Sequence, residues 1–374
     1  MKLWQIGFLL LLTIILFGQY ALNPMIAGAD TWFYVNQVCG KTIHDTRDII
    51  FDTLTTIIPC DFIVMKIYLA ILFFTMLFFS AKIGELYDKE HGWMLALIIG
   101  FFTMFSLEFI VFENDSLGFT LFFIALFFVL RAFKEKKPMI SNDNLLAAGF
   151  LIMAGLCWKG VAYWVFALVI INPIFIIPLI GILGTQWDNL LWFITANRGI
   201  QEQVMFLGIM YLGLTPLFLF GLTKVSKKEV LACCLMLIPC IFVQKLYVLA
   251  IPFISIVALM GVLSIKKYRD TIISTIIVFS LFMAAFFGMH TYQEFPTVDD
   301  FAVVQAAAQD TNYVENSFGI GYVAIYNGLN VSSYGSTDGN DFVCSGYVLS
   351  HPWINDCNSC VVLNTSKNII LYRC

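Results

Sequence analysis

The sequence predicts a multi-span α-helical membrane protein that carries a small α/β domain at its carboxyl end. Hydrophobic residues make up 60% of its 374 residues and charged residues only 12%, whereas about a quarter of the residues in a soluble domain are charged. The mean hydropathy is +0.85, and apolar stretches of about 18 residues, the length of a membrane-spanning helix, recur along the chain. The composition changes to that of a soluble segment after residue 289, so we expect a transmembrane domain over 1–289 and an α/β domain over 290–374.

The apolar pattern predicts about eleven membrane helices. Their expected ranges are 3–21, 62–80, 93–112, 116–131, 145–158, 161–172, 174–185, 204–222, 230–243, 246–264 and 272–289. The fifth, sixth, seventh and ninth segments are short for a bilayer, so we expect them to pack inside the bundle. A polar loop is expected between Gly184 and Gln203.

Basic residues indicate the orientation of these helices. Three of the predicted connections are rich in lysine and arginine: Arg131, Lys134, Lys136 and Lys137; Lys224, Lys227 and Lys228; and Lys266, Lys267 and Arg269. Such residues remain on the cytoplasmic side of a membrane. The pattern therefore predicts a cytoplasmic amino terminus, in a plasma membrane or endomembrane, and an extracytoplasmic position for the 290–374 domain.

The connection over 22–61 contains Thr31-Trp32-Phe33-Tyr34, which predicts an interfacial helix with aromatic side chains at the depth of the lipid headgroups. A signal peptide is an alternative for the first apolar segment, because Ala27-Gly28-Ala29 resembles a signal-peptidase site. The apolar run is long for a signal peptide, and the pattern of basic loops does not depend on it.

The carboxyl-terminal segment shows short elements of both types. We expect helices over 299–309 and 319–327, a strand over 313–316, and paired strands over 360–364 and 369–373. Even numbers of cysteines occur in the two outer segments: Cys39 and Cys60 in one, and Cys344, Cys357, Cys360 and Cys374 in the other. These numbers favour disulfides in an oxidising compartment, while the Cys357–Cys360 spacing leaves a metal or redox site as an alternative.

Two acidic clusters follow apolar segments at the same predicted membrane face. Asp30 comes after the first segment, and Glu113-Asn114-Asp115 comes after the third. Carboxylates beside lipid are costly and are kept mainly for ions, protons or substrates. Oxygen ligands one residue apart suit hard cations that bridge to phosphates, so Asp30, Glu113 and Asp115 predict a Mg²⁺ or Mn²⁺ site. Helix capping is the alternative, with Asp30 before a helix that begins at Thr31, and Asn114 or Asp115 at the start of the fourth segment.

Three other charged residues lie near the same face. Lys159 interrupts an apolar region and Lys245 precedes the tenth segment, where each would contact a phosphate or extend to the headgroups. Glu202 lies in Gly199-Ile200-Gln201-Glu202, before the eighth segment. The sequence contains no Walker loop, no GxGxxG motif and no histidine pair, and no basic patch predicts binding to nucleic acid.

The order of these motifs resembles the GT-C glycosyltransferases, and most of all the catalytic subunit of oligosaccharyltransferase. The family's first outer acid is similar to Asp30 before Thr31–Tyr34, and its DxD or ExD motif is similar to Glu113-Asn114-Asp115. Its TIxE-like segment resembles Gly199–Glu202. Its late Arg-Phe segment resembles Lys245-Leu246-Tyr247, with lysine in place of arginine.

Two features depart from that family. The WWDYG acceptor motif is absent, and the chain has Glu315–Tyr322 where it would fall. The predicted soluble domain is also much smaller than in the family, so the resemblance leaves the acceptor open between a protein, a lipid and a glycan.

The resemblance implies a metal-dependent transferase that moves a sugar or oligosaccharide from a polyprenyl-phosphate or -diphosphate donor to an acceptor at the outer face of the bilayer. Asp30, Glu113 and Asp115 would hold the cation and act in catalysis. Lys159 and Lys245 would contact phosphate, and Glu202 would position the acceptor or the metal. The alternatives are a transporter or flippase for lipid-linked substrates, and a non-catalytic membrane assembly protein.

Overall fold

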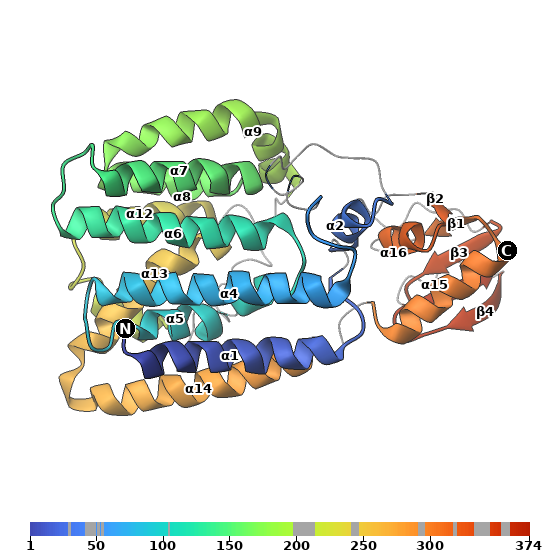
Figure 1. Ribbon diagram of the computed structural model, residues 1–374, viewed down its shortest axis with the longest axis horizontal. Coiled ribbons are helices and arrows are strands. Elements are labelled where there is room, and N and C mark those ends of the chain that lie inside the picture. The colour runs from blue at the N-terminus through green and yellow to red at the C-terminus, as the bar shows by residue number, and fades with distance from the viewer. Residues whose placement is uncertain are drawn as a thin grey trace.

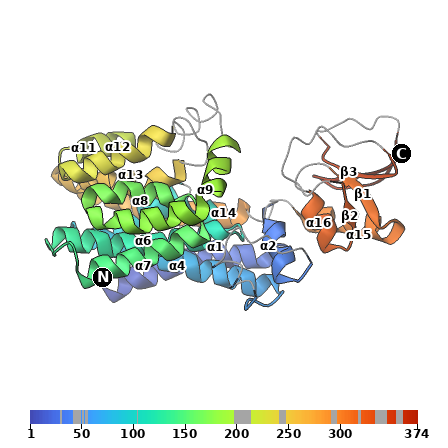
Figure 2. The ribbon, with the colours of Figure 1, turned by 90° about the horizontal axis from the view of Figure 1, so that it is seen from above.

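The computed structural model describes residues 1–28, 31–41, 50, 53, 56–103, 105–196, 214–240, 247–290, 296–316, 320–332, 345–352 and 360–374. A helical bundle forms one end of the molecule and a small sheet with two helices forms the other (Figure 1). Viewed from above, the same two parts lie side by side, with α2 between them (Figure 2).

The bundle contains long helices that run between its two ends and shorter helices packed among them. They are α1 (Leu3–Leu22), α4 (Phe62–Glu85), α5 (Met94–Leu97), α6 (Asn114–Lys134), α7 (Asn142–Cys157), α8 (Val161–Ile171), α9 (Ile176–Ala196), α11 (Thr215–Gly221), α12 (Lys227–Cys240), α13 (Tyr247–Ser264) and α14 (Arg269–His290). Short helices η1 (Ile98–Phe102), η2 (Phe105–Phe109), η3 (Pro173–Phe175) and η5 (Lys266–Tyr268) complete it. Helix α1 lies along α14, with Gly288 against Gln19 and the Leu16 carbonyl.

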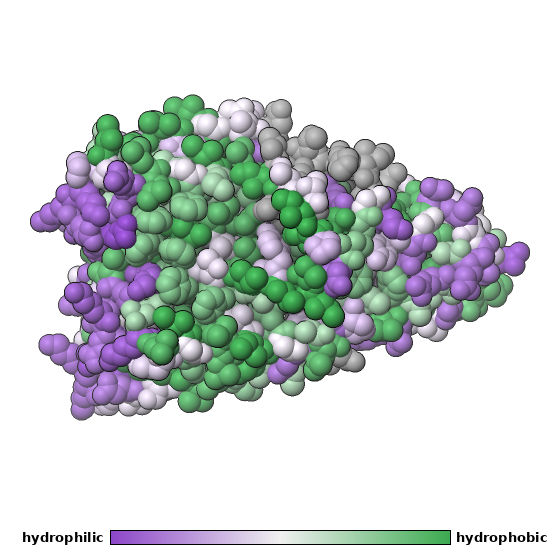
Figure 3. Space-filling view, viewed as in Figure 1, coloured by the Kyte–Doolittle hydropathy of each residue, from purple (hydrophilic) through white to green (hydrophobic). Residues whose placement is uncertain are grey.

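Four stretches of the described chain are long and apolar enough to cross a membrane: Leu3–Leu22, Phe62–Glu85, Asn114–Lys134 and Lys266–Met289. Other described apolar helices are shorter, such as Asn142–Cys157 and Val161–Ile171. The protein is therefore a helical membrane protein, while the expected count of eleven spans is not confirmed. Apolar side chains cover the flank of the bundle, and hydrophilic ones gather at its free end and over the carboxyl-terminal part (Figure 3).

The expected span over 93–112 is wrong as a continuous helix. It forms the one-turn helix α5, the π-helix η1 and the 3₁₀-helix η2. Gly100, inside η1, packs closely against α4, because a Cβ atom there would lie 2.8 Å from the Leu77 side chain. Irregular backbone at membrane depth is tolerated where it is buried in protein, and residues 92–101 are buried.

Helix α9 corrects a second expectation. It continues to Ala196, so the predicted loop from Gly184 to Gln203 is helical over most of its length. Thr185 supports the continuation, because its hydroxyl donates to the Gly181 carbonyl one turn earlier, at 3.0 Å. A polar side chain that returns its hydrogen bond to its own helix does not end the helix.

The basic loops meet at the end of the bundle that carries the amino terminus, called here the basic end. Lys134 pairs with Glu229 at 3.1 Å, which joins the end of α6 to the start of α12. Tyr87 donates a hydrogen bond to the same carboxylate. Arg131 and Lys137 both bind Asp143, at 2.6 Å and 2.7 Å, which joins α6 to α7. These contacts confirm that the basic residues of separate loops share one end of the bundle.

The carboxyl-terminal part contains a five-stranded mixed sheet in the order β2-β1-β3-β5-β4. The elements are α15 (Val298–Asp310), β1 (Tyr313–Asn316), α16 (Ile320–Tyr326), β2 (Asn330–Val331), β3 (Tyr347–Ser350), β4 (Val361–Thr365) and β5 (Ile370–Arg373). Strand β1 is parallel to β2 and β3, whereas β5 is antiparallel to β3 and β4. The predicted helices, the first strand and the final hairpin are therefore confirmed.

Asp300 connects α15 to the turn between β4 and β5. Its carboxylate accepts hydrogen bonds from the Ser366 hydroxyl at 2.5 Å and from the Asn368 amide at 2.8 Å, and the Thr297 backbone N–H donates to it at 2.8 Å. Burial favours the neutral form of Asp300, but these hydrogen bonds stabilise the anion more, so its pKa is lowered.

Helix α2 (Thr31–Val38) joins the bundle to the carboxyl-terminal part. Trp32 is fully buried and contacts Phe62 of α4, Phe301 of α15 and Tyr326 of α16, with ring centroids 5.0–5.7 Å apart. The helix is where the sequence predicted it, but Trp32 is buried inside the protein and does not face lipid.

Two disulfides are described, Cys39–Cys60 and Cys360–Cys374. The first ties the chain after α2 to the start of α4, and the second closes the β4–β5 hairpin. Disulfides are therefore confirmed in both outer segments. Because Cys360 bonds Cys374, a disulfide within the Cys357–Cys360 spacing is excluded. Cys344 and Cys357 lie outside the described residues.

Candidate functional site

Three segments singled out in the sequence converge at the end of the bundle that faces α2. They are the chain leading into α2, the start of α6 with Glu113-Asn114-Asp115, and the turn from α7 to α8 with Trp158-Lys159. A candidate site here depends on what holds these segments together.

Asn114 makes the central connection. It is the first residue of α6 and is 6% exposed. Its Oδ1 accepts a hydrogen bond from the Tyr34 hydroxyl at 3.0 Å, and its Nδ2 donates to the Cys157 carbonyl at 2.8 Å. One amide thus joins α2, α6 and the end of α7, with a predicted site acid on either side of it.

A second connection lies beside the first. The Phe112 N–H donates to the Thr31 hydroxyl at 3.0 Å. Thr31 directly follows Asp30 and Phe112 directly precedes Glu113, so the two predicted acidic segments lie one hydrogen bond apart. Gly28, with φ +100°, permits this approach, because a Cβ atom there would lie 2.4 Å from the Val111 side chain.

The two acids of the motif lie at the amino end of α6, half-buried. Glu113 is the N-cap residue, but its side chain makes no capping hydrogen bond, and the Asn114 amide is used by Tyr34 and Cys157. The capping alternative is therefore wrong for Asn114. The positive end of the helix dipole stabilises the negative charge of Glu113 and Asp115 at this position.

Lys159 is half-buried and lies at the turn before α8. The preceding Trp158 is 4% exposed and packs its ring against Phe119 of α6 at 4.8 Å and Trp164 of α8 at 5.7 Å. This packing holds the Lys159 backbone on the same side of the bundle as Glu113 and Asp115.

Lys66, a residue that sequence reasoning missed, holds the segment that leads from α1 toward Asp30. It lies on α4, is 3% exposed, and donates to the carbonyls of Tyr20, at 3.2 Å, and of Asn23. Its ammonium also lies 4.6 Å from the centre of the Tyr20 ring. The Tyr20 hydroxyl in turn accepts the Ala27 N–H at 2.8 Å. Lys66 thus fixes the chain from the end of α1 to Gly28, just before Asp30.

Asp30, Glu202 and Lys245 lie outside the described residues, so the structure gives no geometry for them. No group of three His, Cys, Asp or Glu side chains that could hold a metal ion is found in the described part of the chain. Glu113 and Asp115 provide two of the three predicted carboxylates. Their oxygen donors fit a hard divalent cation, provided that Asp30 supplies the third.

Sequence reasoning named Asn114 and Tyr34 only as parts of longer motifs, without a role in the site, and did not single out Lys66. A buried lysine four residues into a long apolar helix was a detectable sign, since a charge at such a position needs partners. The role of Asn114 depends on contacts with residues far away in the chain, which no spacing rule reveals.

No protein-family model and no curated protein matches the sequence. Solved structures do match. The crystal structure of ArnT from Cupriavidus metallidurans, bound to undecaprenyl phosphate, has a TM-score of 0.63 and 9% identity over 99% of this chain and 97% of that one. The Archaeoglobus fulgidus oligosaccharyltransferase, tethered to an acceptor peptide containing the NVT sequon, has a TM-score of 0.60 and 11% identity over 96% of this chain and 70% of that one. At these identities the similarity is one of fold alone: the chain shares the fold of these two membrane proteins.

Proposed function

We propose that the protein is a GT-C-type glycosyltransferase that takes a sugar from a polyprenyl-phosphate or -diphosphate donor and works at the membrane face of α2. The observation that carries this proposal is the pair of hydrogen bonds made by Asn114, which joins three segments bearing predicted site residues. Two proteins of similar fold support it, one bound to undecaprenyl phosphate and one to an acceptor peptide.

The reaction is attack by an acceptor on the anomeric carbon of the sugar. The new bond forms to the acceptor atom, the bond to the donor phosphate oxygen breaks, and the lipid phosphate leaves with the electron pair. Asp30 accepts the proton that the acceptor loses. Lys159 and Lys245 bind the donor phosphate, and Glu202 positions the acceptor.

Asp30, Glu113 and Asp115 would hold Mg²⁺ or Mn²⁺. When bound, such an ion offsets the charge that develops on the departing phosphate. The Asn114 hydrogen bonds fix the backbone between Glu113 and Asp115 at the start of α6, which lowers the cost of organising the site during the reaction.

Purified protein in detergent, supplied with Mn²⁺ and a panel of undecaprenyl-phosphate-linked hexoses and pentoses, tests the proposal. We expect release of undecaprenyl phosphate, detected by mass spectrometry, with at least one donor. The Asp115→Ala variant should lose nearly all of this activity. Asp299→Ala is the matched control, because Asp299 is an exposed aspartate at the second position of α15, as Asp115 is at the second position of α6.

Two outcomes would contradict the proposal. If Asp115→Ala releases lipid phosphate at the rate of the unmodified protein, the acids do not act in the reaction. If no donor is cleaved but a fluorescent undecaprenyl-phosphate lipid changes leaflet in proteoliposomes, the protein is a transporter.

A further inference from the structure

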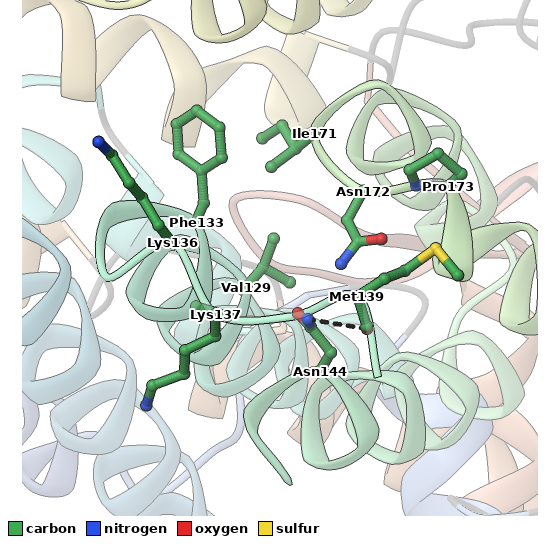
Figure 4. A pocket seen from close by; sticks show the side chains of 10 residues that line it. Val129, Phe133, Lys136, Lys137, Met139, Asn144, Ile171, Asn172 and Pro173 are labelled. Atoms are coloured by element: carbon green, nitrogen blue, oxygen red, sulfur yellow. Dashed lines mark hydrogen bonds between the residues drawn. The ribbon is translucent and has the colours of Figure 1, made fainter. Parts of the chain in front are cut away.

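A cavity of about 380 Å³ opens at the basic end of the bundle, at the opposite end from the candidate site (Figures 1 and 4). It lies where α6, α7 and the α8–η3 connection meet. Its lining residues are Val129, Ala132, Phe133, Lys136, Lys137, Met139, Asn144, Ile171, Asn172 and Pro173. This volume is at the small end of the range for ligand sites, so it suits a headgroup-sized molecule.

A buried polar atom in the wall lacks a partner. Asn144 is 1% exposed, and its Nδ2 donates to the Pro138 and Met139 carbonyls at 3.1 Å and 3.0 Å. These two bonds fix the orientation of the amide. Its Oδ1 is buried and makes no hydrogen bond within the described chain. An acceptor left in this state is costly unless a ligand donates to it.

A second amide faces the same space. Asn172 lies across the cavity with its side-chain nitrogen toward the centre (Figure 4). Its Oδ1 is already used, because it accepts the Ile174 N–H at 3.2 Å. The cavity therefore offers one acceptor, from Asn144, and one donor group, from Asn172.

The charges around the cavity favour an anion. Of the nearby cations, Arg131 and Lys137 share Asp143. Lys136 forms no ion pair with any described residue. Lys228 donates to the carbonyl of Ile171, in the cavity wall, at 3.4 Å. Lys137 also pairs with Glu135, at 2.8 Å. Within the described residues neither Lys136 nor Lys228 has an ion-pair partner, so two positive charges lie beside the cavity without one.

The backbone at Lys136 is unusual, because its φ of +51° lies in the left-handed region. Of the non-glycine residues described, Lys136 alone adopts a positive φ. A lysine bears a steric cost in this conformation that a glycine avoids. A glycine here would keep the loop and remove only the cation, which makes a clean test possible.

Apolar side chains surround the opening. Met139, which lines the cavity, is 53% exposed, and its neighbours Ile140, Leu145 and Leu146 are 67%, 54% and 49% exposed. This arrangement, apolar on the flank and cationic at the rim, matches the boundary between acyl chains and headgroups.

We propose that the cavity binds the headgroup of an anionic, hydroxyl-bearing phospholipid. The phosphate lies between Lys136 and Lys228, a headgroup hydroxyl donates to Asn144 Oδ1, and the acyl chains leave past Met139.

Native mass spectrometry of the full-length protein, titrated with single lipids, tests this proposal. The probes are phosphatidylglycerol, phosphatidylmethanol, which has the same charge but no free hydroxyl, and phosphatidylcholine, which is neutral. We expect phosphatidylglycerol to bind about fivefold more tightly than phosphatidylmethanol, as one hydrogen bond predicts, and phosphatidylcholine to bind most weakly. Comparing lipids avoids changing Asn144, whose amide holds the loop.

Two variants of Lys136 test whether its positive charge contributes to lipid binding. Lys136→Gly and Lys136→Gln should each weaken phosphatidylglycerol binding about fivefold, the effect of one lysine at an anionic surface. Lys267→Gln is the control, because Lys267 is a cation at the same end of the bundle that does not line the cavity. Lys136→Gly should also leave the melting temperature unchanged or raise it.

Three results would overturn the proposal. Equal binding of the three lipids would show that the cavity recognises neither the charge nor the hydroxyl of the headgroup. If Lys267→Gln weakened phosphatidylglycerol binding as much as Lys136→Gln does, only the overall charge of the basic end would matter. Binding of soluble glycerol phosphate in detergent, as tight as that of the lipid and sensitive to Lys136→Gln, would assign the cavity to a soluble phosphoester.

Discussion

The substitution Asn114→Ala tests most directly whether the candidate site is organised as described. It removes the amide that accepts from Tyr34 and donates to Cys157 and leaves both neighbouring acids in place. Alanine is a good helix former, so α6 itself should persist.

The magnitude follows from the two lost bonds. Each contributes about 1 kcal/mol net, and the Cys157 carbonyl, on a fully buried residue, costs a further ~1–3 kcal/mol when its partner is lost. We therefore expect the free energy of unfolding to fall by about 3–5 kcal/mol. Because a displacement of about 1 Å in a site can cost about 100-fold in rate, we expect sugar transfer to fall by roughly that factor.

The assay combines thermal unfolding with release of lipid phosphate from the donor. Asn142→Ala is the matched control, since Asn142 is the first residue of α7, as Asn114 is of α6, but is exposed. Tyr34→Phe removes only one of the two bonds and should have a smaller effect. In the double variant of Asn114→Ala and Tyr34→Phe, the losses of stability and activity should not add, because both changes break the same Tyr34–Asn114 contact.

Full activity and normal stability in Asn114→Ala would refute the reasoning. So would equal losses in Asn114→Ala and Asn142→Ala, because the effect would then belong to any helix amino terminus.

Three further predictions concern the supports around the site. Trp32→Ala should destabilise the junction between the bundle and the carboxyl-terminal part by about 3–5 kcal/mol, seen as a separate early unfolding transition, and a single unshifted transition would contradict it. Lys66→Met should lower kcat more than it raises KM, because it releases the chain before Asp30, and Lys66→Arg should restore part of the rate; a change in KM alone would oppose this role. Because hydrogen bonding lowers the pKa of Asp300 below its ordinary value of 3.8, the stability it provides is complete above pH ~4 and is lost as the pH falls through the lower folded value. Asp300→Asn should therefore reduce the protection of β5 amides from hydrogen exchange at pH 7 by about 2 kcal/mol and remove this acid sensitivity; an unchanged exchange profile would contradict the assignment.

Local patterns predicted the parts of the fold that depend on nearby residues. Alanine and valine at helical spacing identified α15, and the turn around Ser366 identified the β4–β5 hairpin. The break over 93–112 was missed, because hydropathy detects apolar character but not the close packing of Gly100 against α4. Strand β3 was missed as well, because it pairs with β1 and β5 across long stretches of chain.

In the site too, local patterns were predicted from the sequence and long-range contacts were not. Glu113 and Asp115 stood out, because acids beside lipid are conspicuous in any sequence. Their order along the chain also predicted a likeness to oligosaccharyltransferase, and the solved structures confirm that likeness at the level of the fold. The burial of Trp32 could not be predicted, because its partners Phe301 and Tyr326 come from the far end of the chain.

The position of α1 has a consequence for biosynthesis. One neighbour of α1, helix α4, is synthesised soon after it. The other neighbour, α14, begins only at Arg269. While the ribosome is still producing the middle of the chain, the side of α1 around Gln19 is left to the surrounding lipid. The amino-terminal helix is inserted first but reaches its final packing among the last, so assembly of this membrane protein is completed late in translation.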